Sequence, residues 1–547
     1  MGIAKTHSGG LMISRRQFFL RSGLAAAGLA NCSKSFAVTP TSAALKPCHH
    51  YTRLFTPGPA STPGSPTEKR LIDLAKAMKD PLNSDGNEDS SGDSTIFAGY
   101  TYLGQFIDHD LTLDITPLDQ VKPDNVEYTR NFRNPFLNLD HLYGDSPNIS
   151  SFLYRRHAPQ EAGEERFLLG STAQSSVVGG ASNTANTLPS SCNDLPRNSQ
   201  GIALVGDPRQ DENLILAQMH VAFLKLHNLF LDEPQKIGDF SYYKIDPPFE
   251  AAKRVLTWHY QWIVRNEFLS AIIDPTVFNR LDKSPYRSAL TSPLRNFQIP
   301  VEFSAAAFRF GHSMVRHQYH YNFWHDKKPA VLLDDLFQRT GFGQPGNVPV
   351  PETWVIEWNR FFPLRDKFHI EKARKIDTNI TEDLYYLLPP QLRAFSAVTT
   401  SKPKFATADP PELPIRTLLR GSRMGLPTAQ TVAETMRLLD PKIRILESKE
   451  IASGPQGYIV KQYGFDRQTP LWYYILKEAE VINGGEKLGP IGSRIVADVI
   501  LASLAADPNS YVNVAGRDWK PTLQISGIAD MLALVTPDKP TKACSST

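Results

Sequence analysis

The sequence predicts a mainly α-helical protein with one large domain, long irregular loops and little β-structure. Apolar residues recur at helical spacing in several long segments, which indicates amphipathic helices packed on a common core. The chain contains 42 prolines and 34 glycines, which favour irregular connections between helices. With 547 residues and 41% hydrophobic content, it is long enough to bury a large core.

Helical periodicity is clearest in five segments. They are Asn213 to Phe230, Phe249 to Ile273, Thr428 to Leu439, Pro470 to Val481 and Ile491 to Ala505. Three polar stretches of low complexity or turn-rich composition are expected to form loops, namely Ser61 to Pro66, Asn83 to Thr95 and Leu169 to Ser191.

Residues 1–37 form a predicted export signal. Ser14 to Arg21 fits the twin-arginine pattern, and the weakly apolar run Ser22 to Ala30 is too short to span a bilayer. Ser35 to Ala37 can serve as the cleavage end, although Leu29 to Cys32 also resembles a lipobox, with Asn31 as a poor fit. The signal predicts a bacterial protein exported by the twin-arginine machinery, periplasmic or extracellular, without a membrane span.

The rest of the chain divides into a loop-rich extension over residues 38–95, one domain over residues 96–540 and a polar tail over residues 541–547. If Cys32 leaves with the signal, Cys48, Cys192 and Cys544 remain, which allows one disulfide but no disulfide framework. The net charge of +3 is near neutral for this length, so no nucleic-acid-binding surface is expected.

The most informative polar stretch is Gly104 to Asp110. Gln105, Asp108 and His109 are spaced i, i+3 and i+4, so they share one face of a helical turn. Apolar neighbours surround these groups, and burying them costs free energy unless a site uses them. Asp110 points off the shared face. The pattern suits a histidine that exchanges a proton beside a ligand-binding carboxylate, whereas the alternative is a helix terminus with a core histidine.

Arg209 and Glu212 form a second candidate pair. They are three residues apart at the start of the helix predicted from Asn213, so both side chains can face one pocket. The alternative is an ordinary ion pair at a helix start.

A third segment, Phe303 to Val315, is predicted to be a buried helix with Arg309 and His312 three residues apart. An imidazole in such a helix is a candidate fifth ligand for haem iron. The alternative is a histidine whose hydrogen bonds are satisfied in the core. A fourth segment, Asn134 to Gly144, alternates oxygen donors as a calcium loop does, although a plain Asx-rich turn also explains it.

These four segments, in this order, resemble the animal-type haem peroxidases, the peroxidase–cyclooxygenase superfamily that includes myeloperoxidase and lactoperoxidase. The resemblance extends from about Phe97 to about Leu504. It implies the haem peroxidase fold for residues 96–540 and haem b as the cofactor.

The resemblance also implies roles for the residues on the distal side of the haem. His109 would be the acid–base residue, Arg209 would polarise the O–O bond of hydrogen peroxide, and Gln105 would hold water or a halide. Asp108 and Glu212 would form ester links to the haem. The family's methionine link would be missing, because Asn213 follows Glu212 here.

On the proximal side, His312 would bind the haem iron and Arg309 would lie near a propionate. The family hydrogen-bonds its proximal histidine to an asparagine, and counting back from Gly425 places Thr417 at that position. A hydroxyl can accept that bond, but its influence on the iron would differ.

The resemblance also implies a set of calcium ligands. The set consists of Asp110, Asn134, the carbonyl of Phe136, Asn138 and Asp140. The cluster of His317, His320 and His325 could also bind a metal, but a surface or core role is more common for such residues.

The implied activity is reduction of hydrogen peroxide through a ferryl intermediate, with oxidation of a halide or pseudohalide (iodide, thiocyanate or bromide) or of phenolic donors. A fatty-acid dioxygenase of the same superfamily is disfavoured, because Arg309 occupies the position of its radical-forming tyrosine. An exported non-catalytic binding protein is disfavoured because the expected site residues are all intact.

Overall fold

The computed structural model describes residues 49–536, apart from residues 85, 156–164, 179–184, 234–247, 282–296, 326–329, 342–346, 365–368, 387–409 and 522–524. The predicted export signal and the polar tail therefore lie outside the described residues. The described residues from His49 onward form one compact unit.

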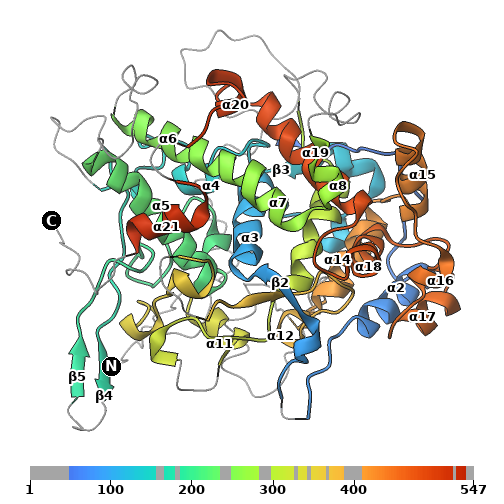
Figure 1. The fold of residues 1–547 in the computed structure, drawn as a ribbon, viewed down its shortest axis with the longest axis horizontal. Helices are drawn as coiled ribbons and strands as arrows, with labels where there is room; N and C mark the ends of the chain where they lie inside the picture. The colour runs from blue at the N-terminus through green and yellow to red at the C-terminus, as the bar shows by residue number, and fades with distance from the viewer. Residues whose placement is uncertain are drawn as a thin grey trace, which may run out of the picture. The chain divides into compact units, whose positions relative to one another are not determined.

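Long apolar helices make the core of this unit. Helices α5 (Leu214–Asp232), α18 (Leu471–Asn483) and α19 (Pro490–Ala506) are buried along most of their length. Helix α5 packs against α6 (Pro248–Ile263) and α3 (Gly99–Leu111). Figure 1 shows α3 near the centre of the fold, with α5 and α6 beside it. This arrangement places α3 where its polar face can line an interior cavity.

The five periodic segments are confirmed as helical. Four form single helices within one or two residues of the expected bounds: α5, α15 (Ala429–Leu439), α18 and α19. Side chains of Asn213 and Thr428 cap the first two by accepting backbone N–H bonds. The fifth segment is divided into α6, a π-helical turn over Val264–Phe268 and α7 (Leu269–Ile272).

Among the described residues, α5 alone is long and apolar enough to cross a membrane. However, 78% of its most apolar window is buried inside the protein. Its burial on all sides is typical of a core helix in a large domain.

Strands are few and short in the described parts of the chain, as expected. All four sheets are antiparallel pairs: β1 (His49–His50) with β3 (Arg130–Asn131), β2 (Asp93–Phe97) with β8 (Lys372–Arg374), β4 (Ser175–Val178) with β5 (Ala185–Leu188), and β6 (Gln318–Tyr319) with β7 (Val331–Leu332). The β4–β5 hairpin lies in the stretch expected to be a surface excursion and extends away from the helices (Figure 1).

The segment expected to be a loop-rich extension contains a helix that belongs to the core. Helix α2 (Pro66–Ala77) begins after the Ser65 cap and buries Leu71 and Leu74. It packs on α14 (Leu413–Arg423), and Glu68 pairs with Arg423 across that contact. The boundary expected at residue 96 therefore does not separate two structural parts.

Shorter helices fill the connections. They are α4 (Asp140–Tyr143), α8 (Pro275–Phe278), α10 (Val301–Ser304), α11 (Leu333–Gln338), α12 (Glu382–Tyr385), α16 (Ser448–Ile451), α17 (Gly457–Gln462), α20 (Tyr511–Val514) and α21 (Ile528–Val535). One disulfide involves Cys192, whose partner lies outside the described residues.

Candidate active site

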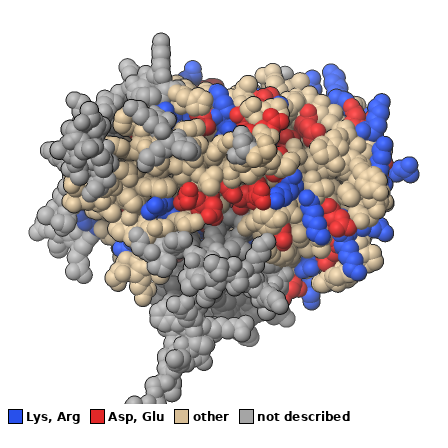
Figure 2. Space-filling view, turned by 90° about the horizontal axis from the view of Figure 1, so that it is seen from below, with Lys and Arg blue, Asp and Glu red and all other residues tan. Residues whose placement is uncertain are grey.

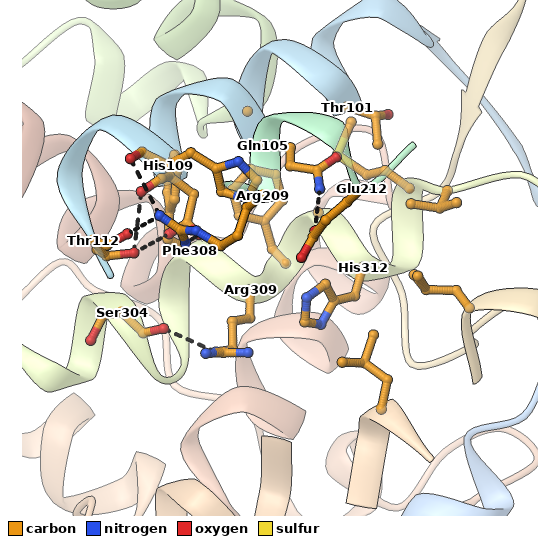
Figure 3. Close-up of a pocket in the computed structure, with 18 of the residues that line it drawn as sticks. Thr101, Gln105, His109, Thr112, Arg209, Glu212, Ser304, Phe308, Arg309 and His312 are labelled. Atoms are coloured by element: carbon orange, nitrogen blue, oxygen red, sulfur yellow. Dashed lines mark hydrogen bonds and ion pairs between the residues drawn. The ribbon is translucent and has the colours of Figure 1, made fainter. Parts of the chain in front are cut away.

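Seven of the site residues predicted from the sequence line one cavity of about 420 Å³. They are Gln105, Asp108, His109, Arg209, Glu212, Arg309 and His312. The cavity wall includes residues from α3, from the segment before α5, from the segment after α10 and from α14. Figure 3 shows Gln105, His109, Arg209 and Glu212 in its upper part, with Arg309 and His312 below them.

Helix α3 supplies the distal residues from its last two turns. Gln105, Asp108 and His109 line the cavity, whereas Asp110 is fully buried on another side of the helix, as the spacing predicted. The helix ends at Thr112, whose hydroxyl donates to the Asp108 carboxylate at 2.9 Å. Gly104 lies within the helix rather than at its start.

Arg209 is held over the end of α3 by two kinds of acceptor. Its guanidinium donates to the carboxylate of Asp207 at 3.1 and 2.8 Å and to the carbonyl of Thr112 at 2.6 Å. Burial by itself would lower the pKa of Arg209, but the Asp207 carboxylate raises it above its usual value. The charge of Arg209 is therefore permanent and fixed in position, in a wall that it shares with His109.

Glu212 reaches the cavity beside Gln105. The Gln105 amide donates to Glu212 Oε2 at 3.5 Å, and the Asn213 amide donates to Gln105 Oε1 at 3.1 Å. Asn213 also accepts the backbone N–H of Leu216, which caps α5. The cap thus positions the amide that orients Gln105.

His109 is almost completely buried, with 3% of its surface exposed. Burial, and then the charge of Arg209, lower its pKa well below the usual range. The amide Nε2 of Gln210 lies 3.4 Å from His109 Nδ1 and restrains the ring. A neutral imidazole in this place can accept a proton.

The segment carrying His312 is not the continuous helix expected from the sequence. Helix α10 ends at Ser304, and a 3₁₀ helix follows over Ala307–Met314. The Arg309 Nε–H donates to the carbonyl of Ser304 at 2.9 Å, and the indole of Trp472 donates to the carbonyl of Arg309 at 3.2 Å. These two bonds satisfy carbonyls that a continuous α-helix would pair with its own N–H groups.

His312 lines the same cavity as His109. Its Nδ1 is buried and has no hydrogen-bond partner among the described residues. Burial, followed by the charges of Arg309 and Arg416, lowers the pKa of His312 to about 3. The ring is therefore neutral, which is the form of imidazole that binds metals.

Thr417 does not make the contact expected for it. Its hydroxyl donates to the carbonyl of Leu413 on the same helix at 2.9 Å. It lines a separate cavity of about 170 Å³, while Leu413 and Arg416 face the larger one. The helical phase of α14 thus points Thr417 away from the cavity that His312 lines.

Several cavity residues were missed from the sequence. Arg416 and Arg420 come from one face of α14, and Arg420 donates to Asp114 at 2.8 Å. Their i, i+4 spacing was a usable signal. Tyr51, also in the wall, follows the two-residue strand β1, and no pattern in the sequence linked it to α3.

Asp110 lies beside the loop predicted to bind calcium, and its carboxylate contacts N–H groups of that loop. Its carboxylate accepts the backbone N–H groups of Leu139 at 3.1 Å and Asp140 at 2.9 Å. Its Oδ1 also lies 3.2 Å from Nδ1 of the buried His141. These donors satisfy the Asp110 carboxylate within the chain.

Two of the other predicted calcium ligands accept backbone N–H groups of the same loop. The carbonyl of Phe136 accepts the N–H of Asn138 at 3.0 Å, and Asn138 Oδ1 accepts the N–H of Asp140 at 3.2 Å. Asn134 Oδ1 is buried without a hydrogen-bond partner in the described part of the chain. No cluster of three or more His, Cys, Asp or Glu residues suited to a metal occurs among the described residues. Calcium binding at this loop stays a prediction from the sequence.

The three histidines after the proximal segment have separate partners. His317 Nδ1 lies 2.9 Å from Asp383, and His320 Nδ1 lies 3.1 Å from Glu371. His325 Nδ1 lies 2.7 Å from Asn322. They act as structural residues, as the commoner interpretation predicted.

The residues that line the cavity fit a haem. A neutral imidazole with an unpaired buried nitrogen lies on one side, and a second neutral imidazole lies in the opposite part. Arg309, Arg416 and Arg420 can bind carboxylates such as propionates. Apolar residues including Phe308 and Met314 complete a wall suited to a flat apolar ring.

Comparisons with known proteins agree with this geometry. The family model for animal haem peroxidase matches residues 119–395, which include Arg209, Glu212 and His312. A peroxidase-like protein of Margaritifera margaritifera is 40% identical over 114 residues, which are 20% of this chain and 14% of that relative. The aligned region therefore spans about a seventh of that relative.

Solved structures share the fold over most of the chain. Peroxidase A from Dictyostelium discoideum matches with a TM-score of 0.55 and 15% identity, covering 90% of this chain and 93% of that one. A fatty acid alpha-dioxygenase of Arabidopsis thaliana matches with a TM-score of 0.56 and 12% identity, covering 88% and 77%. At these identities the likeness concerns the fold alone.

Proposed function

Because the chain belongs to the animal haem peroxidase family, we propose that it is a haem-dependent peroxidase. The observation that carries the proposal is the position of His109 and His312, which come from segments two hundred residues apart and line one cavity with both rings neutral. When bound, the haem supplies a redox-active iron that accepts the oxidising equivalents of hydrogen peroxide.

His312 would hold the iron, and the guanidinium groups of Arg309, Arg416 and Arg420 would bind the propionates. On the other side, His109 accepts a proton from hydrogen peroxide and returns it to the departing oxygen. Arg209, kept cationic by Asp207, stabilises the negative charge that develops as the O–O bond breaks.

We further propose that the haem is ester-linked through Asp108 and Glu212. Both carboxylates lie in the cavity wall, and 34% of the Asp108 side chain is exposed there. The Thr112 hydroxyl at 2.9 Å and the Arg209 guanidinium at 3.9 Å hold the Asp108 carboxylate in that wall. Each link would replace a C–H bond of a haem methyl with a C–O bond, and hydrogen peroxide would be the oxidant. Asn213 supplies no third link, because it has no sulfur atom; its amide instead donates to Gln105 and its oxygen caps α5.

The proposed second substrates are iodide, thiocyanate or bromide, with phenolic donors as the other class. A cavity that contains Arg209 and the Gln105 amide suits small anions. A fatty-acid dioxygenase remains the second candidate on fold likeness alone. Arg309 occupies the position at which dioxygenases of this superfamily have a radical-forming tyrosine. This difference favours the peroxidase.

The deciding experiment is an absorption spectrum of the purified protein supplied with haem, before and after acid–organic extraction, followed by addition of peroxide. A Soret band that survives extraction and responds to peroxide supports an ester-linked peroxidase. Asp108→Asn and Glu212→Gln are each expected to increase the extractable haem, while Asp119→Asn, on the surface, leaves it unchanged. Absence of a Soret band would favour an exported binding protein.

The proposed location is outside the cytoplasm of a bacterium, by twin-arginine export. It depends on the Arg15-Arg16 pair in the sequence. Replacing both with lysine should retain the protein in the cytoplasm, which fractionation and immunoblotting would detect.

A further inference from the structure

Trp472 lies directly beside His312, outside the wall of the larger cavity. Its ring meets the imidazole edge-to-face, with centroids 6.0 Å apart and an interplanar angle of 76°. The indole is 2% exposed, and its N–H donates to the carbonyl of Arg309. The indole is therefore fixed against the residue that would bind the iron.

The 170 Å³ cavity connects Trp472 with the surface. Trp472 and Tyr463 both line it, together with the exposed Arg70 of α2. Tyr463 directly follows α17 and lines this cavity. It is half-buried, so part of the residue also contacts solvent.

Tyr463 has a proton acceptor in place. Its hydroxyl donates to Asp73 Oδ2 at 2.8 Å, and 42% of the Asp73 side chain is exposed. This hydrogen bond raises the pKa of Tyr463, so the phenol keeps its proton at neutral pH. A phenol that loses an electron becomes strongly acidic, and a carboxylate at this distance can take the proton.

We propose that Trp472 and Tyr463 form an electron relay from a donor docked at the Tyr463–Asp73 pair to the haem. The inference rests on the proposed peroxidase function and extends it to bulky one-electron donors that do not enter the larger cavity. Indole and phenol are among the side chains most readily oxidised by one electron. Trp472 contacts the proximal histidine, and Trp472 and Tyr463 line one cavity.

Electrons and protons balance along this route. Trp472 would give one electron to a haem that peroxide has oxidised. The indole cation would then take one electron from Tyr463, whose proton moves to Asp73. The donor then reduces the tyrosyl radical, and Asp73 returns the proton. Two donor molecules lose one electron each, and one hydrogen peroxide with two protons yields two waters.

The charge around Tyr463 indicates an anionic donor. Lys69, Arg70 and Lys461 are exposed on α2 and α17, and Arg70 acts electrostatically on Tyr463. Figure 2 shows Lys and Arg side chains gathered at the right-hand end, where Figure 1 places α2 and α17. Exposed cations attract anionic donors and raise their rate of encounter.

The test uses the haem-loaded protein treated with peroxide and a nitroso spin trap, without donor, followed by peptide mass spectrometry. We expect an adduct on Tyr463 that is lost in Trp472→Phe, whose Soret band is checked first. Tyr458, which is 76% exposed one helical turn away, is the matched control and should carry none. An adduct on Tyr463 that persists in Trp472→Phe, or equal labelling of Tyr458, would overturn the relay.

Two surface variants keep the proposal testable if Trp472→Phe does not fold. Tyr463→Phe and Asp73→Asn should slow oxidation of the anionic sulfonated dye ABTS by about tenfold and leave iodide oxidation unchanged, whereas Tyr458→Phe changes neither. Equal ABTS rates in all variants would refute the relay. Failure of the wild type to oxidise either donor would instead refute the proposed function.

Discussion

Burial sets the protonation state of the residue most important for peroxide chemistry. His109 is in the interior beside the fixed charge of Arg209, and both keep its pKa well below the usual range. The imidazole is therefore a neutral base throughout the neutral pH range, as the proposed reaction requires. The same burial means that its removal has few consequences for the surface of the protein.

His109→Ala is expected to retain haem, because His312 lies on the other side of the cavity, and to slow the reaction with peroxide by about 10²–10⁴-fold. Stopped-flow recording of the Soret change after mixing with peroxide measures that rate. His320→Ala, at the distant Glu371 contact, serves as the control and should react at the wild-type rate. A wild-type rate in His109→Ala would remove its acid–base role.

The contacts of Asp110 affect what is expected of the predicted calcium site. Two backbone N–H groups and the imidazole of His141 contact its carboxylate, so contacts within the chain attach Asp110 to the loop over residues 134–140. Treatment with EGTA should therefore leave both the Tm and the Soret band unchanged, and metal analysis should find no stoichiometric calcium. A Tm that falls with EGTA and recovers with calcium would show that the loop binds calcium.

At the scale of elements, a buried acid joins α18 to α19. Glu478 is fully buried and accepts the N–H groups of Ile491 at 3.0 Å and Gly492 at 3.2 Å. Burial raises its pKa from 4.5 to about 8, despite these bonds. The folded protein therefore keeps a proton that the unfolded chain releases at lower pH.

The sign of the pH effect follows from this shift. The stabilisation is complete below the unfolded pKa of 4.5 and is lost as the pH rises through about 8. Between those values the wild-type Tm should fall more steeply than that of Glu478→Gln, measured by calorimetry. The exposed Glu434→Gln should keep the wild-type slope, and an unchanged slope in Glu478→Gln would contradict the raised pKa.

Two elements show why side-chain periodicity alone misplaces site residues. The apolar pattern predicted one helix over Phe303–Val315, but a hydrogen bond from Trp472, distant in sequence, stabilises a break after α10. Motif counting assigned Thr417 to the proximal histidine, whereas the phase of α14 turns Arg416 to the cavity instead. The first outcome depends on a partner from another element, and the second on the rotation of α14 relative to the cavity.

At the scale of the whole molecule, the N-terminal segment is fastened to the domain by a buried ion pair. Glu68 of α2 is 3% exposed and accepts Nε of Arg423 at 2.6 Å and Nη2 at 3.1 Å. Arg423 also donates to the carbonyl of Leu118. Helix α2, within the predicted extension over residues 38–95, is therefore part of the folded core.

Glu68→Ala should lower the free energy of unfolding by about 3–5 kcal/mol, because Arg423 is left buried without its counter-charge. Chemical denaturation monitored by tryptophan fluorescence measures the loss. Glu382→Ala removes the partly exposed Lys79 pair and should change the free energy of unfolding by less than about 1 kcal/mol. Similar losses in both variants would show that α2 is not held by this buried pair.

The sequence alone determined the fold class, the main core helices and seven of the polar residues that line the cavity. Local spacing fixes which residues share a helical face, so Gln105, Asp108 and His109 were found together, and the order of motifs supplied His312 and Arg209. Tertiary structure alone decided the break before His312, the direction of Thr417, the contribution of Tyr51 and Arg416, and the N–H donors around Asp110. These features depend on contacts between segments far apart in the chain, which periodicity and spacing do not encode.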